Sequence, residues 1–131
     1  LGRSRGGLTT KAVAAVDAGG RLLALAVLPG QRPDLDAAAA LLAALPGAPG
    51  RVVADRGFSA AKFRDAIAAL GAEPCVPAQP THPRAPFDRP AYARRNRVER
   101  FWARMKEWRG VAARFDKTAT CFAAGVTLAA A

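Results

Sequence analysis

The amino-acid sequence predicts a single α/β domain on the basis of its length, its composition and the order of its apolar segments. With 131 residues, the chain is long enough for one domain and too short for two. Hydrophobic residue types make up 51% of it, which is enough to bury a core. Short apolar runs typical of strands alternate with segments of helical periodicity, and this order indicates a mixed sheet flanked by helices.

Two strands joined by a tight turn are expected first. Residues 9–16 and 21–28 are apolar segments of strand length. The Asp-Ala-Gly-Gly stretch at 17–20 suits a hairpin turn, because glycine tolerates positive φ. Pro29-Gly30 then ends the second strand.

Helices and short strands alternate in the middle of the chain. Asp34 is the expected N-cap of an alanine- and leucine-rich helix, and Ser59 is the expected N-cap of a second helix that stops at Gly71. The expected elements are a helix over 34–45, a strand over 51–54, a helix over 60–70 and a strand over 74–76.

The C-terminal part is expected to hold a loop and two helices. Residues 77–90 contain five of the ten prolines and predict an exposed loop. The strongest helical pattern covers 91–109, and a last apolar helix covers 118–131. The apolar stripe expected to face the core of the long helix consists of Val98, Phe101, Met105 and Trp108.

Charge predicts a polyanionic partner. The chain carries a formal net charge of +10 and a pI near 11.2, and nucleic acid is the usual partner of such a protein. Residues 84–114 alone hold ten Lys or Arg and three acidic residues. Charge-free runs such as 37–50 are too short to span a bilayer, and the N-terminal residues lack an export-signal pattern. We therefore expect no membrane association and a cytoplasmic location.

One face of the predicted long helix combines a carboxylate with cations and a tyrosine. This face consists of residues that recur at spacings of three and four, namely Tyr92, Arg95, Glu99, Trp102 and Lys106. For an isolated helix, the favoured explanation of this pattern would be an ordinary surface face with salt bridges such as Arg95 to Glu99. The surrounding cationic excess favours a surface that follows phosphates, with a single carboxylate embedded in it.

Asp55 is the second candidate carboxylate. It follows the apolar run 51–54 directly and precedes Arg56-Gly57-Phe58, which reads as a turn. Active sites of open α/β sheets gather at the carboxyl ends of strands, although an aspartate here also suits a turn cap. Together with Glu99, Asp55 would supply hard oxygen ligands for Mg²⁺.

These residues resemble a known family, the bacterial insertion-sequence DDE transposases of the insertion-sequence-five type. The long helix fits their Y-R-E-K signature, and Asp55-Arg56-Gly57-Phe58 is similar to the D-x-G-[FY] phrase that carries their second catalytic aspartate. The resemblance covers nearly the whole chain in the right order. Further similar segments are 2–11, 29–32, 96–101 and 114–118.

The resemblance implies an RNase H-like fold in which three carboxylates hold two divalent ions, Mg²⁺ or Mn²⁺. Asp55 and Glu99 would be catalytic residues and metal ligands. No residue matches the family's first aspartate, because the sequence is expected to be part of the catalytic domain and to lack the fold's first strand. Asp17 is no substitute, since it falls in the hairpin turn, and Val13 and Pro33 stand where many relatives have histidines. The residues expected to bind DNA are Tyr92, Arg95, Lys106, Arg94, Arg97, Arg100 and Arg104.

The expected function is therefore DNA transposition in the bacterial nucleoid. The intact enzyme would cut transposon-end DNA and join the freed 3′-hydroxyl to target DNA by two-metal phosphodiester chemistry. Its partners would be both DNAs and the upstream part of the transposase or a second protomer. This chain alone, as a truncated or second-frame fragment, is expected to be inactive. The alternative function is a basic DNA-binding remnant that does not cut.

Overall fold

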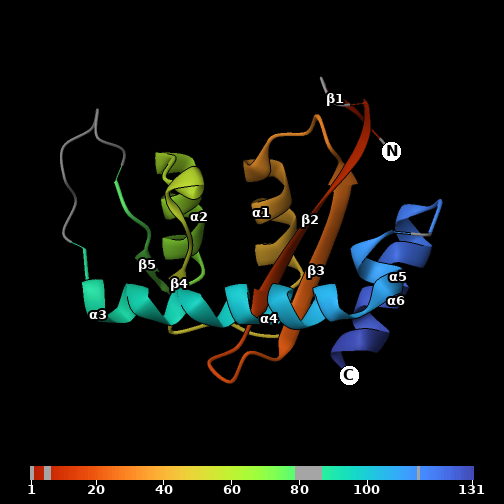
Figure 1. Ribbon diagram of the computed structural model, residues 1–131. Helices are drawn as coiled ribbons and strands as arrows, with labels where there is room; N and C mark the ends of the chain where they lie inside the picture. The colour runs from red at the N-terminus through yellow and green to blue at the C-terminus, as the bar shows by residue number, and fades with distance from the viewer. Residues whose placement is uncertain (1, 5–6, 79–86, 115) are drawn as a thin grey trace.

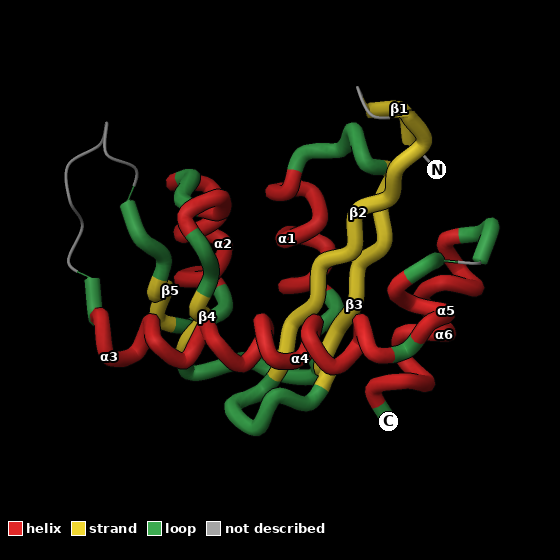
Figure 2. Tube along the Cα trace, in the orientation of Figure 1, coloured by secondary structure: helices red, strands yellow, loops and turns green. Residues whose placement is uncertain are grey.

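The computed structural model describes residues 2–4, 7–78, 87–114 and 116–131 (Figure 1). It confirms a mixed α/β architecture, although the strands form two separate sheets (Figure 2). Most of the expected loop 77–90 lies outside the described residues.

The first sheet has three antiparallel strands in the order β1-β2-β3, namely Gly2–Ser4, Gly7–Val16 and Leu22–Pro29. The sequence did not predict β1. The predicted turn between β2 and β3 is confirmed: Asp17 Oδ1 accepts hydrogen bonds from the amides of Gly19 and Arg21 at 2.8 and 2.9 Å. Gly20 has a φ of 86°, which explains the glycine at this position. Hydrogen bonds from Arg21 also lower the pKa of the Asp17 carboxyl.

The second sheet pairs two short parallel strands, β4 (Arg51–Val53) and β5 (Glu73–Cys75). The helices α1 (Asp34–Ala43) and α2 (Ala61–Ala69) flank this part of the chain. Their apolar side chains form one core cluster with the sheet, made by Ala38, Phe63, Ile67, Ala72 and Val76, with Val52 and Ala54 packed against it. This cluster fixes the position at which β4 ends.

The expected long helix is a chain of shorter pieces, α3 (Arg89–Tyr92), a 3₁₀ turn (Ala93–Arg95), α4 (Asn96–Glu107) and α5 (Arg109–Ala112). Asp88 caps its start by accepting from the Ala91 amide at 3.0 Å. Trp108 has an extended backbone conformation (ψ 110°), which ends α4. The last helix, α6 (Ala119–Ala130), begins after Thr118, whose hydroxyl accepts from the Cys121 amide.

The second core cluster joins α4 and α6 to the hairpin. Phe101, Met105, Phe122 and Val126 are buried against alternate residues of β2 and β3. Because neighbouring residues of a strand point to opposite faces, α4 and α6 cover one face of the hairpin. The helix α1 packs against the same two strands, and Figure 1 shows it beside β2.

The two sheets leave strand edges unpaired. Within the described residues, β2 pairs with β3 over 10–16, and β1 pairs with β2 only at 7–9. The strand β4 pairs only with β5 in this part of the chain. The helical segment from α3 to α4 runs from the side of the β4–β5 sheet to the front of the β2–β3 hairpin (Figure 1) and so links the two halves.

Three local predictions were wrong. Trp108 was expected in the core and has an exposed fraction of 55%, because the chain leaves helical geometry at this residue. Pro33 takes the N-cap position in place of Asp34, which stands in the first turn and pairs with Lys11 at 2.5 Å. Ser59 ends a 3₁₀ turn, and Ala60 is the N-cap of α2.

No helix within the described ranges is long and apolar enough to cross a membrane.

We predict that Phe101→Ala lowers the free energy of unfolding by about 3–5 kcal/mol, because it empties the centre of the second core cluster. Phe101 has an exposed fraction of 1%. Leu128→Ala is the control, since Leu128 is 76% exposed on α6 and its truncation should cost less than about 0.5 kcal/mol. Urea unfolding followed by circular dichroism measures both changes, and equal losses would contradict this assignment of the core.

Candidate active site and nucleic-acid interface

Asp55 lies at the carboxyl end of β4, where the sequence placed it. Its Oδ1 accepts a hydrogen bond from the Gly57 amide at 2.7 Å and so caps the 3₁₀ turn Arg56–Phe58. This contact is the turn cap that the sequence also allowed, and it uses one of the two carboxylate oxygens. The turn holds the backbone of Asp55 in an extended conformation at the end of the strand.

Gly57 has no room for a side chain beside this carboxylate. A Cβ atom built at residue 57 would lie 2.9 Å from Asp55 Oδ1. The glycine of the Asp-Arg-Gly-Phe phrase therefore allows the carboxylate to reach the amide. Its physical role is to fix the direction of Asp55.

Asp55 borders an open pocket of about 710 Å³, which also involves the start of the long helical segment. Tyr92 and Arg95 line the same pocket, and the Arg95 guanidinium lies 5.7 Å from the centre of the Tyr92 ring. The structure thus brings Asp55 together with two of the predicted site residues, although Asp55 is more than thirty positions away in the sequence. Two arginines that sequence reasoning did not select, Arg56 and Arg89, complete the cationic lining.

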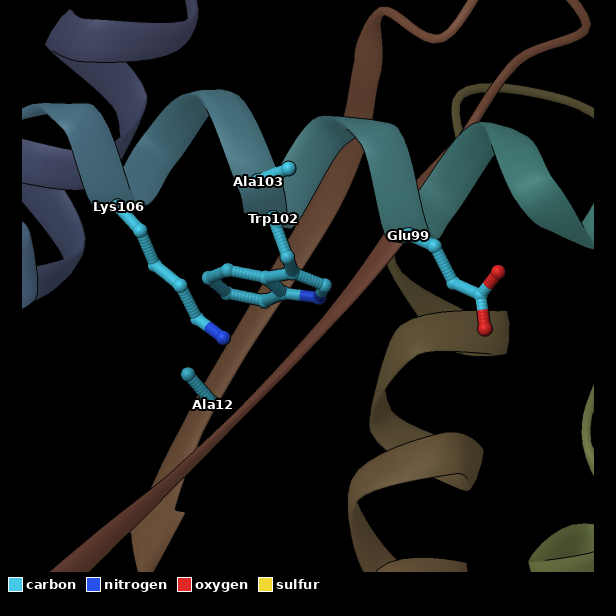
Figure 3. A pocket seen from close by; sticks show the side chains of 5 residues that line it. All are labelled: Ala12, Glu99, Trp102, Ala103 and Lys106. Atoms are coloured by element: carbon cyan, nitrogen blue, oxygen red, sulfur yellow. The ribbon is translucent and has the colours of Figure 1, made fainter.

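Glu99 lies one helical turn beyond Arg95 and accepts a hydrogen bond from its guanidinium. Glu99 also borders a second open pocket, of about 630 Å³, with Trp102, Lys106 and Ala12 of β2 (Figure 3). Figure 3 shows the indole of Trp102 between the Glu99 and Lys106 side chains. Arg95 therefore connects the two pockets, since it lines the first and pairs with a residue of the second.

The sequence also allowed this face to be an ordinary surface with a salt bridge between Arg95 and Glu99. The structure contains that salt bridge. The Glu99 side chain is 52% exposed, so the pair contributes roughly 0–1 kcal/mol at most. Stability therefore does not require a carboxylate here. Within the described residues, no group of three or more His, Cys, Asp or Glu could hold a metal ion. Asp55 and Glu99 alone do not form a complete metal site.

The predicted DNA-binding cations fall on two flanks of α4. With 3.6 residues per turn, Glu99 and Lys106 lie on one side of the buried Phe101–Met105 stripe, and Arg97, Arg100 and Arg104 lie on the other. Arg94 precedes α4 in the 3₁₀ turn and is exposed. Arg104 donates to the Gly20 carbonyl at 3.1 Å, and so holds the β2–β3 turn.

Comparisons with known proteins identify the family of this chain. The family described as "Transposase DDE domain" matches residues 2–131. A protein of Brucella ovis described as "Putative transposase for insertion sequence element IS6501" is 37% identical over 126 residues, which cover 95% of this chain and 96% of the relative. No solved structure matches the chain. The chain belongs to the insertion-sequence DDE transposases, and its predicted membership of that family is confirmed.

We predict that Gly57→Ala turns the Asp55 carboxylate away from the residue 57 amide. The loss of stability should stay below about 1 kcal/mol, because the carboxylate is the end of a side chain that can rotate. The residue 57 amide proton should then exchange faster and its signal should move upfield in ¹H–¹⁵N NMR spectra. Asp55→Asn is the control, since its amide oxygen still accepts the bond, and an unchanged residue 57 amide in Gly57→Ala would contradict the role of this glycine.

Proposed function

We propose that this chain is part of the catalytic domain of a transposase that cuts transposon-end DNA and joins the 3′-hydroxyl to target DNA. One observation carries the proposal: the signature residues Tyr92, Arg95, Glu99 and Lys106 follow one another along one helical face, and the first two share a pocket with Asp55. The family membership supports the same chemistry. The nucleoid would be the place of action.

We further propose that the two sheets are parts of one RNase H-like sheet, completed by a strand between β2 and β4. Both strands have an edge without a strand partner in the described residues. Unpaired edges invite pairing with another strand. The added strand would come from the upstream part of the transposase or from a second protomer.

The proposed metal site follows from the same completion. Carboxylate oxygens are the ligands that Mg²⁺ prefers, and one or two protein carboxylates with substrate phosphates commonly hold it. Asp55 has one oxygen outside the turn cap, and the half-exposed Glu99 carboxylate lines an open pocket that Lys106 also lines. A third carboxylate on the added strand would complete the set. When bound, a pair of Mg²⁺ or Mn²⁺ ions would polarise the phosphodiester and activate its attacker.

The residues of this chain have distinct roles in the proposed reaction. Asp55 and Glu99 provide fixed negative charge at the two ends of the site. Arg95 and Lys106 hold phosphates on either side of the reacting group, and Arg95 neutralises Glu99 before DNA arrives. Water breaks the bond between phosphorus and the 3′ oxygen, and the freed 3′-hydroxyl then displaces the corresponding oxygen of the target strand.

The second candidate function is DNA binding without cutting. It is favoured by one observation, that the described residues offer no group of three potential metal ligands. Binding needs only the cationic surface, whereas cleavage needs the complete carboxylate set.

Completion of the sheet predicts a change in hydrogen exchange. In the chain alone, β2 amides that point away from β3 should exchange within seconds to minutes, because no strand accepts from them. When the polypeptide encoded upstream is supplied, the same amides should become protected. Amides bonded to β3 are the internal control, and unchanged exchange of both sets would contradict the added strand.

Cleavage tests the function itself. The chain alone should not cut a labelled transposon-end duplex in Mg²⁺ or Mn²⁺, and the chain supplied with the upstream polypeptide should cut it unless EDTA is present. In that protein, Asp55→Asn and Glu99→Gln should each reduce cutting at least about 100-fold and leave DNA affinity equal or higher, because each removes a negative charge near phosphate. Asp55→Asn keeps the turn cap, so a lost activity cannot reflect a lost turn. If Glu99→Gln cuts DNA normally, Glu99 is not a catalytic residue and serves only as the salt-bridge partner of Arg95.

A further inference from the structure

The pocket beside Asp55 has a cationic lining that the signature residues do not account for. It is formed by the turn after β4, by Pro77 after β5 and by the segment that begins α3. Three arginines line it, at positions 56, 89 and 95, against the single carboxylate of Asp55. The lining therefore carries a net positive charge.

The two additional arginines, Arg56 and Arg89, differ from Arg51 and Arg64, whose side chains are held by partners within the protein. Arg51 pairs with Glu73 and Asp88, and Arg64 donates to the Val76 carbonyl. Arg56 and Arg89 are exposed, and their guanidinium groups make no hydrogen bond or ion pair with another described residue. As far as the described residues are concerned, both guanidinium groups are therefore available to an anionic ligand.

An aromatic wall stands next to these cations. The rings of Phe87 and Tyr92 meet edge to face, with centres 4.9 Å apart, and both line the pocket. Apolar rings beside guanidinium groups suit a nucleotide, because sugar and base pack on the rings while the phosphate meets the cations. The volume of about 710 Å³ lies within the range of small-molecule sites.

We propose that Arg56 and Arg89 bind consecutive phosphates of a DNA strand that crosses this pocket, with one nucleotide packed against Tyr92 and Phe87. The inference rests on the proposed DNA function and names residues outside the signature. Arg56 directly follows Asp55, so a phosphate on Arg56 places the adjoining phosphodiester near the Asp55 carboxylate. Arg89 lies three residues before Tyr92 on α3 and would reach the DNA strand from this second element of the pocket.

The test measures binding of a fluorescein-labelled DNA duplex by anisotropy at several KCl concentrations. Arg56→Ala and Arg89→Ala should each weaken binding at least about fivefold at 100 mM KCl and lower the slope of log K against log salt by about one, since each neutralised phosphate releases counterions. The double variant should lower the slope by about two. Arg56→Lys should retain the slope with reduced affinity, because a lysine keeps the charge and loses the planar fork.

Lys62→Ala is the matched control, because Lys62 is an exposed cation of α2 outside the pocket with no described ion pair. It changes the net charge equally and should alter affinity less than about twofold. Thermal unfolding by circular dichroism checks that all variants fold alike. Slopes of Arg56→Ala and Arg89→Ala equal to that of Lys62→Ala would overturn this inference while the DNA function stands. A chain that binds no DNA at any salt concentration would overturn both.

Discussion

The packing of one stripe of α4 on the β2–β3 hairpin determines how the rest of the site is presented. Phe101 and Met105 are almost completely buried against the hairpin and α6. Once this stripe is buried, the helical period sets the direction in which every other side chain of α4 points. Glu99 and Lys106 must then lie on one flank, and Arg97 and Arg100 on the other. A change in the rotation of this helix would separate the carboxylate from its pocket.

A second anchor holds the other carboxylate. Asp55 follows β4, and the core cluster of α1, α2 and the β4–β5 sheet sets the position of this strand. Its carboxylate is then directed by the Gly57 amide. The two candidate ligands therefore belong to different core clusters, and the segment from α3 to α4 joins them. The Asp55 pocket lies between the turn after β4 and the segment that begins at α3, whereas the Glu99 pocket lies between α4 and β2.

The cationic side chains of the described residues contribute little to the stability of the fold. The salt bridges of the described residues are mostly exposed and contribute little to folding. Ion pairs or hydrogen bonds to other parts of the protein hold the guanidinium groups of Arg51, Arg64 and Arg104. The guanidinium groups of Arg56 and Arg89 make neither with other described residues. Arg95 has an intermediate position, because it contacts Tyr92 and Glu99 and also lines the pocket of Asp55. Four cations thus line the pockets of the two candidate carboxylates, namely Arg56, Arg89, Arg95 and Lys106.

Local features of this protein could be predicted from its sequence because they depend on near neighbours. The turn at 17–20 follows from Asp17 and the glycines, and the shared face of Arg95 and Glu99 follows from their spacing of four residues. The location of Asp55 at a strand end follows from the apolar run before it. Composition does not reveal the backbone angles that decide which residue is the N-cap of a helix. These angles place Pro33, and not Asp34, at the N-cap of α1. They also place Ser59 at the end of the 3₁₀ turn, so that it does not cap α2.

By itself, the sequence determined the order of the helices and strands and the cationic character of the chain. It also determined that the signature residues, from Tyr92 to Lys106, share one helical face. Only the tertiary structure decided that the strands form two sheets and that Trp108 is exposed. It also decided that Arg56, Arg89 and Tyr92 share a pocket with Asp55. The physical reason is that periodicity fixes the direction of a side chain relative to its own element. Which elements meet, and which edges stay unpaired, depends on contacts between residues far apart in the chain.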